Sequence, residues 1–431
     1  MGNYCLSVLV EKTFSKLNHN MPRVLRVINR FNLGGPTFNA AYLTRYLQPE
    51  FETKLIGGLK DESEDSSEFV VQNLEIDYLI VEDMRRSINL IKDWRAYLQI
   101  LKIIRSFKPD IVHTHASKAG LLGRMAAIRL KVPVIVHTFH GHVFHSYFGK
   151  LKSAIFKSLE RYLASRSSMI IAISDEQKRE LVEIHQICRT EKMTVIRLGF
   201  DLNKFQKDME NKRNWFRSYY QLQDDEVAIG IVGRLVPIKN HKLFLQAITE
   251  VLKHSKVPIK AFIIGDGSAK QQVKDDADSL ALTFIEQPGT DVFLPGKEDE
   301  TTGDLPSQST LIFTSWIREI DYAYAGLDIV CLTSLNEGTP VSLIEAQASG
   351  KAVVSTKVGG VENIIEHGKT GLLSELSLDE FSQHLIQLVE SAEDRKIMGS
   401  EGINRVLKKY HYSRLADETG QLYTNLLASD K

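Results

Sequence analysis

The chain has 431 residues, of which 43% are hydrophobic and 25% are charged, and this length exceeds one comfortable hydrophobic core, which predicts two domains of roughly 200 residues each. Lys plus Arg and Asp plus Glu both number 54, so the net charge excludes neither acidic nor basic partners. The three scattered cysteines, Cys5, Cys188 and Cys331, exclude a disulfide framework and favour a reducing, cytoplasmic location, and no apolar run is long enough to span a bilayer.

Charge is distributed unevenly along the chain. Residues 1–200 carry a net charge of +9 and residues 201–431 a net charge of −9. Within the first half, residues 101–168 contain 12 Lys and Arg side chains, only two acids, Asp110 and Glu160, and six of the 13 histidines. This concentration predicts a positive surface that attracts an anionic partner. We expect no nucleic acid as that partner, because no recognisable nucleic-acid-binding module accompanies the basic residues and the second half is acidic.

Residues 1–21 precede the first convincing strand and are predicted to be a disordered extension. The segment lacks the basic region and the small-residue cleavage site of a secretion signal. Leu6 stands where the myristoylation pattern requires Ser or Thr. We therefore expect neither secretion nor acylation to be directed by these residues.

After this segment, apolar runs rich in β-formers alternate with segments of helical periodicity, which is typical of βα units around a parallel sheet. The pattern pauses near residue 200 and then starts again. The predicted strands of the first series are residues 24–29, 53–58, 78–82, 110–115, 132–139 and 167–174, with helices such as 37–47 and 122–131, and those of the second are 227–235, 259–267, 309–315, 328–334 and 351–356.

The restart predicts an α/β chain of two doubly wound, Rossmann-like domains, residues 22–200 and 201–412, facing across a cleft. Ligands of open parallel sheets bind beyond the carboxyl ends of the strands, so both sets of loops would reach into that cleft. Residues 286–310 are rich in Gly, Pro and acids and predict a loop insertion in the second domain. A last helix is predicted at residues 413–428, and packing back on the first domain is one arrangement open to it.

The turn after the first strand of the second domain, in GIVGRLVPIKN, combines Gly233, Arg234 and Lys239. A glycine turn with a guanidinium and an ammonium at the start of a helix is typical of a diphosphate site, and two solvated loop cations are the alternative. The spacing excludes a dinucleotide fingerprint, because no G-x-G-x-x-G follows this strand. After the next strand, Gly265 and Gly267 would either admit a ligand close to the backbone or simply form a turn.

Two glutamates flank the start of a predicted helix in NEGTPVSLIEAQASG. Glu337 lies in the loop before the helix and Glu345 inside it, with Pro340 in the first turn and Gly350 at the end. Such carboxylates can accept hydrogen bonds from ribose and sugar hydroxyls, whereas two ordinary surface glutamates are the alternative. Because Glu345 has apolar neighbours, its carboxylate is expected to be either solvent-facing or buried with a hydrogen-bond partner.

The stretch VHTFHGHVFHSYF holds His137, His140, His142 and His145. No cysteine or carboxylate beside them completes a ligand set, so we predict no metal site. Hydrogen bonds within a loop are the expected role of His137 and His145. The D-x-D pair at residues 276–278 falls in a helical segment and is expected on a solvated face.

In order and spacing, the second-half motifs resemble the donor half of family 4 glycosyltransferases, which have the GT-B fold. The resemblance rests on GRLVPIKN, GDG, NEGTPVSLIEAQASGKAVVSTKVGGVENII and HGKTGLL within residues 226–373, where Glu337 and Glu345 match the family's E-x7-E motif. The first half is also consistent with the family, from NRFNLGGPTFNAA through HTFHGHVF to IIAISDEQ.

The resemblance implies a retaining, metal-independent sugar transfer, with a UDP-sugar as the expected donor and no cofactor. The first domain would lie on the acceptor side, and the second would bind the nucleotide-sugar donor. Arg234 and Lys239 would bind the diphosphate and stabilise the leaving group. Glu345 would accept from the ribose, Glu337 from the donor sugar, and His140 would be the active-site histidine that contacts this sugar. The further donor-binding residues that the resemblance implies are Gly34, Gly35, Gly233, Gly265, Gly267, Gly338 and Thr339.

Residues 150–166 carry apolar side chains at helical spacing with interleaved Lys and Arg. Such a helix either lies in the interface of an anionic membrane or packs into the core as an ordinary helix. Together with the basic region, it favours a lipid-linked acceptor and peripheral contact with the inner face of the membrane.

We therefore expect a glycosyltransferase that moves a sugar from a nucleotide-sugar donor to a hydroxyl of a sugar or lipid-linked acceptor, in cell-surface polysaccharide or glycolipid synthesis. Two other functions remain open, a nucleotide-sugar epimerase of the same fold and a catalytically silent carbohydrate-binding subunit. The joint presence of Arg234, Lys239, Glu337, Glu345 and His140 argues against the silent subunit.

Overall fold

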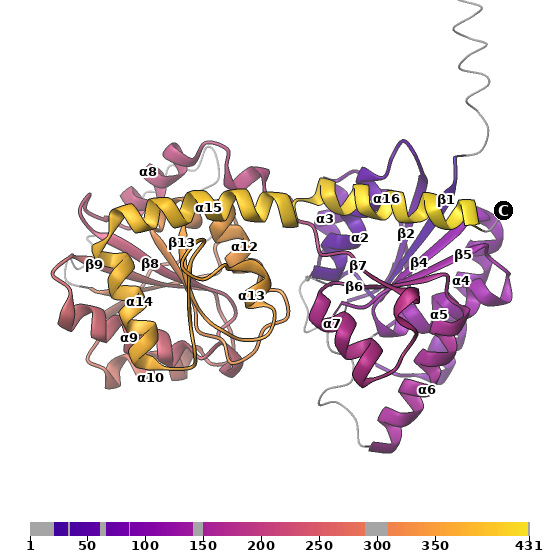
Figure 1. Ribbon diagram of the computed structural model, residues 1–431, viewed down its shortest axis with the longest axis horizontal. Coiled ribbons are helices and arrows are strands. Elements are labelled where there is room, and N and C mark those ends of the chain that lie inside the picture. The colour runs from indigo at the N-terminus through magenta and orange to yellow at the C-terminus, as the bar shows by residue number, and fades with distance from the viewer. Residues whose placement is uncertain are drawn as a thin grey trace, which may run out of the picture. The chain divides into compact units, whose positions relative to one another are not determined.

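The chain forms two compact units around two sheets (Figure 1). Residues 1–200 and 412–431 form the first unit, and residues 201–411 form the second. Each sheet has seven strands, all of them parallel, which confirms the predicted fold class of two doubly wound α/β domains. The computed structural model describes residues 21–32, 35–60, 66–85, 87–140, 150–288 and 309–429, without the side chains of 150–153, so most of the predicted extension and of the predicted insertion lies outside the described residues.

The sheet of the first unit has the strand order β3-β2-β1-β4-β5-β6-β7. β1 pairs with β2 on one side and with β4 on the other, so the winding direction reverses between β1 and β4. In open α/β sheets, ligands bind outside the carboxyl ends of the strands at such a switch point. The strands are β1 Arg23–Ile28, β2 Glu52–Gly58, β3 Tyr78–Val81, β4 Ile111–His115, β5 Val134–Thr138, β6 Met169–Ala172 and β7 Met193–Val195.

The C-terminal helix α16 belongs to the first unit (Figure 1). The ring of Tyr412 stacks on that of Tyr46 in α2, with 4.0 Å between the centroids. Leu415 and Tyr423 are buried in a core that includes Val24 of β1. The helices of this unit are α2 Gly35–Tyr46, α3 Glu68–Asn73, α4 Leu90–Phe107, α5 Ser117–Arg129, α6 Lys150–Arg166, α7 Asp175–Arg179, which continues into one π-helical turn Glu180–Ile184, and α16 Tyr412–Ser429, with a 3₁₀ turn at Thr190–Lys192.

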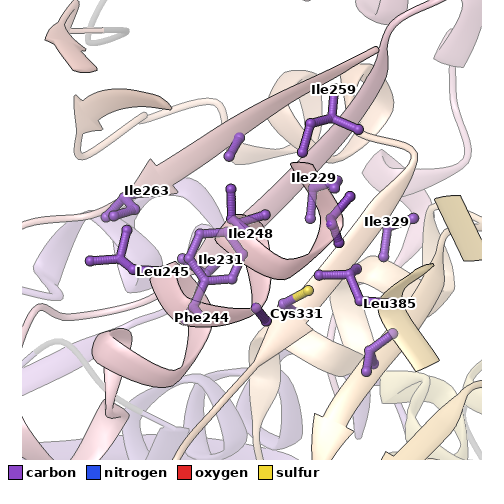
Figure 2. Close-up of a cluster of buried hydrophobic side chains, with 14 of the residues drawn as sticks. Ile229, Ile231, Phe244, Leu245, Ile248, Ile259, Ile263, Ile329, Cys331 and Leu385 are labelled. Atoms are coloured by element: carbon purple, nitrogen blue, oxygen red, sulfur yellow. The ribbon is translucent and has the colours of Figure 1, made fainter. Parts of the chain in front are cut away.

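The sheet of the second unit has the order β10-β11-β9-β8-β12-β13-β14, with its switch point between β8 and β12. Figure 2 shows part of its core, where Ile229 and Ile231 of β8 lie with Phe244 and Ile248 of α9. Parallel strands that are covered on both faces are expected to be apolar throughout, as the central strands β8 and β12 are. The strands are β8 Val227–Val232, β9 Ile259–Ile264, β10 Phe284–Glu286, β11 Leu311–Ser315, β12 Ile329–Leu332, β13 Ala352–Thr356 and β14 Leu372–Ser374.

The helix boundaries of the second unit follow local capping chemistry. The side chains of Ser377 and Ser391 accept backbone hydrogen bonds at the starts of α14 and α15. Gly350 lies just beyond α12 with a φ of +69°, a conformation that favours glycine. The helices are α8 Met209–Tyr219, α9 His241–His254, α10 Lys270–Ser279, α11 Ile320–Gly326, α12 Val341–Ala348, α13 Val361–Ile364, α14 Leu378–Glu390 and α15 Ala392–Tyr410, with 3₁₀ turns at Asn203–Phe205 and Pro237–Lys239.

Among the described residues of both units, no helix combines the length and the apolar character that crossing a membrane requires.

Candidate active site

The carboxyl ends of β8 and β9 meet in two glycine turns. Gly233 follows β8 with a φ of +154°, and Gly265 follows β9 with a φ of +141°. A Cβ on Gly265 would lie 2.0 Å from the carbonyl oxygen of Gly233, and a Cβ on Gly267 would lie 2.4 Å from that of Leu235. The turn after β9 therefore packs directly on the backbone of the turn after β8, which only glycine allows at positions 265 and 267. A Cβ on Gly233 would meet only Cε of Lys239, at 3.8 Å, so the backbone is open at that position.

Lys239 and Glu337 form an ion pair at the same edge. The Nζ of Lys239 lies 2.5 Å from Oε1 of Glu337, although 98 positions separate them in sequence. Lys239 ends the 3₁₀ turn that follows β8, and Glu337 lies in the loop that follows β12, the strand next to β8. Ser334 donates a hydrogen bond of 2.6 Å to the same carboxylate oxygen, and Thr333 donates one of 3.0 Å to the carbonyl of Lys239. Both charged side chains are thus held in one orientation.

The pair remains accessible to solvent, with exposed side-chain fractions of 20% for Lys239 and 12% for Glu337. Arg234, five positions before Lys239, is exposed, and its guanidinium makes no hydrogen bond or ion pair with any described residue. An exposed guanidinium near an oriented ammonium is well suited to bind an anion with two phosphates.

A second glycine turn holds the loop of Glu337. The backbone N–H of Gly360 donates to the carbonyl of Glu337 at 3.0 Å. A Cβ on Gly359 would lie 2.0 Å from that carbonyl oxygen, and a Cβ on Gly360 would lie 1.7 Å from the carbonyl oxygen of Gly338. The turn between β13 and α13 therefore fixes the backbone of Glu337 and Gly338, whereas Thr339 continues from this loop toward α12.

Glu345 lies on α12, half-buried, in a separate group of side chains. Burial raises the pKa of its carboxyl to about 7, while Lys204 and the hydroxyl of Tyr324 favour the charged form and Asp321 opposes it. Asp321 itself pairs with Lys212 at 2.8 Å. The sequence predicted either a solvent-facing or a buried carboxylate. Glu345 is half-buried beside the hydroxyl of Tyr324, and the pKa of its carboxyl is near neutral.

In the first unit, His140 follows β5 and contacts His115 at the end of β4. Nδ1 of His115 lies 2.9 Å from Nε2 of His140. Burial lowers the pKa of His140 to about 3 and that of His115 well below its ordinary value. Both rings are therefore neutral at pH 7, and one of them donates to the other. The remaining ring nitrogens, Nε2 of His115 and Nδ1 of His140, are buried and have no hydrogen-bond partner among the described residues.

Sequence reasoning missed the role of the histidines of β4. His113 lies between Tyr423 of α16 and Thr138 of β5, with Nδ1 at 2.6 Å from the tyrosine hydroxyl and Nε2 at 2.7 Å from the threonine hydroxyl. Its ring centroid is 4.2 Å from that of His115. The signal was present, because two histidines two positions apart in a strand lie on the same face of a sheet.

The other predicted positions have plainer surroundings. His137 lies inside β5 rather than in a loop, which corrects the expectation for this residue, and its Nδ1 lies 2.8 Å from the hydroxyl of Thr114. The D-x-D pair lies on α10, where Asp276 accepts a hydrogen bond from Gln272. Gly35 is the first residue of α2, whereas Gly34, His142 and His145 lie outside the described residues. Within the described part of the chain, no three His, Cys, Asp or Glu side chains are grouped so that they could hold a metal ion.

Two family models match this chain. The model described as Glycosyltransferase Family 4 matches residues 34–204, which include the histidines of the first unit. The model described as Glycosyl transferases group 1 matches residues 226–391, which include the glycine turns and both glutamates. The chain belongs to glycosyltransferase family 4. This membership confirms the resemblance noted from the motifs and the assignment as an enzyme.

Curated relatives of this glycosyltransferase cover most of its length. It is 28% identical to UDP-Gal:alpha-D-GlcNAc-diphosphoundecaprenol alpha-1,3-galactosyltransferase of Escherichia coli, over 81% of this chain and 84% of the relative. It is 25% identical to the capsular polysaccharide biosynthesis glycosyltransferase CapM of Staphylococcus aureus, over 85% of this chain and 89% of CapM. Among solved structures, HepE of Anabaena in complex with UDP matches with a TM-score of 0.74 and 17% identity, over 94% of this chain and 100% of HepE. This structural likeness shows that the glycosyltransferase has the GT-B fold.

Proposed function

We propose that this glycosyltransferase moves a hexose from a UDP-sugar to a hydroxyl of a lipid-linked acceptor, with retention of the anomeric configuration, in the synthesis of a cell-surface polysaccharide or glycolipid. The observation that carries the proposal is the oriented Lys239–Glu337 pair near the exposed Arg234, at the switch point of the second sheet. The activity named for the Escherichia coli relative, which involves UDP-Gal and a diphosphoundecaprenol, supports this donor and acceptor class. A location on the cytoplasmic face of the membrane is part of the same proposal.

The two cations have the first role in this mechanism. When the bond between the anomeric carbon and the diphosphate oxygen breaks, negative charge develops on the leaving UDP. Arg234 and Lys239 stabilise that charge electrostatically, so the reaction needs neither a metal ion nor a cofactor. The backbone of Gly233 lets the diphosphate approach closely, because a Cβ there would meet only Cε of Lys239, at 3.8 Å, while Gly265 and Gly267 let the next turn pack against it.

The acids and the histidine bind and orient the sugar and the ribose. Glu337, fixed by Lys239 and Ser334, accepts from a hydroxyl of the donor sugar, with Gly338 and Thr339 beside it. Glu345 accepts from the ribose. His140, kept neutral by burial, donates to or accepts from the sugar. Retention places the acceptor oxygen on the face from which UDP departs, so the acceptor proton can pass to the departing oxygen.

A donor panel followed by a transfer assay tests the proposal. UDP-, GDP- and ADP-sugars are compared by thermal shift on the full chain, because a ligand that binds only the folded state raises the unfolding temperature. The donor that binds is then incubated with a short-chain polyprenyl diphosphate sugar, and the product anomer is determined by NMR. We expect stabilisation by UDP-sugars and a product with the anomeric configuration of the donor.

Three results would overturn the proposal. Conversion of the donor sugar without any acceptor would identify an epimerase instead. Binding of sugars without any turnover would identify a silent binding subunit. A product with the inverted anomer would exclude the retaining mechanism.

A further inference from the structure

Exposed large apolar side chains are concentrated where α4 begins. Ile88, Leu90, Ile91, Trp94 and Leu98 have exposed fractions of 67%, 84%, 68%, 61% and 46%, and we call this set the α4 face. At 100° per residue, the four members within the helix span an arc of about 100°. The core face of α4 adjoins this arc, with Ala96, Tyr97, Ile100, Leu101 and Ile104 buried. Leu79 and Ile80 of the neighbouring edge strand β3 add further exposed apolar surface, at 39% and 37%.

The exposed charges of α4 itself are basic, whereas Glu82 is an exposed acid just after β3. Lys92, Arg95, Lys102 and Arg105 are all exposed on the same helix. Asp93 is the one acid in α4, and it is turned away to pair with Lys118 at 2.7 Å, with an exposed side-chain fraction of 18%. An apolar strip that includes a tryptophan and is bordered by Lys and Arg is the pattern of a helix that lies in the interface of an anionic bilayer.

The α4 face lies at the edge of the first sheet where acceptor chemistry is expected. Lys118, in the first turn of α5 just after β4, binds the carbonyl of Ser87 at 2.5 Å and the carboxylate of Asp93 at 2.7 Å. These contacts tie the start of α4 to the carboxyl end of β4. His115, the last residue of β4, contacts His140 at this same end of the sheet.

We propose that the α4 face docks this enzyme on an anionic lipid bilayer, with its apolar side chains in the interface and its cations against the headgroups. This inference rests on the proposed function, because it brings the acceptor edge of the first unit to the surface that holds a lipid-linked substrate. It also moves the predicted membrane contact from α6 to α4. In α6, Ile155 and Tyr162 are exposed, whereas Leu163 and Ala164 are buried in the core.

Vesicle binding by the full chain tests the proposal. Sedimentation is measured with vesicles of phosphatidylglycerol and phosphatidylethanolamine in equal parts and with vesicles of phosphatidylcholine alone. The double variant Leu90→Ser/Trp94→Ser removes apolar side chains of the α4 face. The double variant Lys92→Glu/Arg95→Glu removes cations beside it. Trp215→Ser changes a tryptophan of α8 that is 51% exposed, and Ile155→Ser/Tyr162→Ser tests α6.

We expect the wild type to bind the anionic vesicles. The charge variant should bind them at least about 25-fold less, since each of the two lost cations changes affinity about fivefold. The apolar variant should bind them at least about tenfold less, because it loses two large apolar side chains from the interface. The Trp215 and α6 variants should bind as the wild type does. Unfolding temperatures should be unchanged, because every substituted side chain is exposed. Transfer to full-length polyprenyl acceptors in vesicles should fall in the α4 variants, while transfer to the short-chain, detergent-free acceptor should not.

Two kinds of result would overturn the docking proposal, and a third would refute only the proposed function. Wild-type binding by both α4 variants, or loss of binding in the α6 variant alone, would assign the contact elsewhere. If the wild type does not bind vesicles but forms dimers, and the α4 variants disrupt these dimers, a second copy of the chain covers the α4 face. Vesicle binding without any sugar transfer to the short-chain acceptor would instead refute the proposed function and leave the docking surface intact.

Discussion

Lys239 and Glu337 do not stand out within their own sequence segments, and it is the fold that brings them together in one site. Each was visible in the sequence as one charged residue in a loop, for which solvent exposure is the ordinary outcome. Their contact depends on β8 and β12 being neighbours across the switch point, and this pairing joins segments that are far apart in sequence. The glycine turns could be predicted from local spacing alone, whereas the ion pair and the contact of His115 with His140 could not, because both depend on strand order.

Lys239→Ala and Glu337→Ala are each expected to lower the turnover rate by about 10²- to 10³-fold, because each removes a group proposed to act on the transition state. Steady-state rates with saturating donor measure this effect. The unfolding temperature should change little, since both side chains are partly exposed and Ser334 still binds Glu337 in the lysine variant. Lys242→Ala, an exposed lysine on α9, is the matched control. Wild-type rates in either site variant would contradict the assigned roles.

The carboxyl of Glu345 should make the free energy of unfolding depend on pH. Its pKa rises from 4.5 to about 7 on folding, so between these values the folded chain holds a proton that the unfolded chain has lost. The free energy of unfolding contributed by this group therefore falls as pH rises through this window, by about 3 kcal/mol in total. Glu345→Gln should remove the effect and be more stable than the wild type at pH 8, but not at pH 4. Parallel melting curves at both pH values measure the difference, and an identical offset at both would refute the assignment.

At the scale of elements, the longer strands of both sheets could be predicted from the sequence, and the three-residue strands could not. β7, β10 and β14 have three residues each and no usable periodicity. All three lie at edges of the sheets, where pairing with one neighbour is enough to define a strand. The turn between β13 and α13 also acts as a unit, because its two glycines hold the loop of Glu337.

Gly360→Ala tests this turn. The added Cβ would overlap the carbonyl oxygen of Gly338, so the loop of Glu337 must shift. We expect about a tenfold or greater loss of kcat/KM for the donor with a folded second unit, because a displacement near 1 Å in a site is costly. Lys357→Ala changes an exposed side chain before the same turn and serves as control. Unchanged kcat/KM in the glycine variant would show that the turn does not position the loop.

At the scale of the whole molecule, the chain passes between the units twice, after Phe200 and after His411. The first unit is therefore completed by the last segment of the chain. Tyr423 of this segment is fully buried and bonds His113 and Arg26, at 2.6 Å and 3.2 Å from its hydroxyl. The sequence left the position of this helix open, because its apolar face does not specify the surface that it covers.

A chain that ends at residue 411 is expected to lose the cooperative unfolding of the first unit and to keep that of the second. Deletion of α16 exposes the core around Leu415 and Tyr423, whereas residues 201–411 remain complete. Calorimetry of the truncated and full-length chains measures both transitions. Tyr423→Phe, which removes one hydroxyl, should cost the first unit only about 1–3 kcal/mol. A truncated chain that melts like the full-length chain would contradict this dependence.

The late position of α16 has a consequence for synthesis on the ribosome. Domains usually fold in the order in which they emerge, yet here the first unit must wait for residues 412–431, while the second unit is already complete when His411 emerges. Nascent chains should therefore acquire protease-resistant structure in the middle first, and a premature stop near the end would leave half of the enzyme native and the other half a target for chaperones.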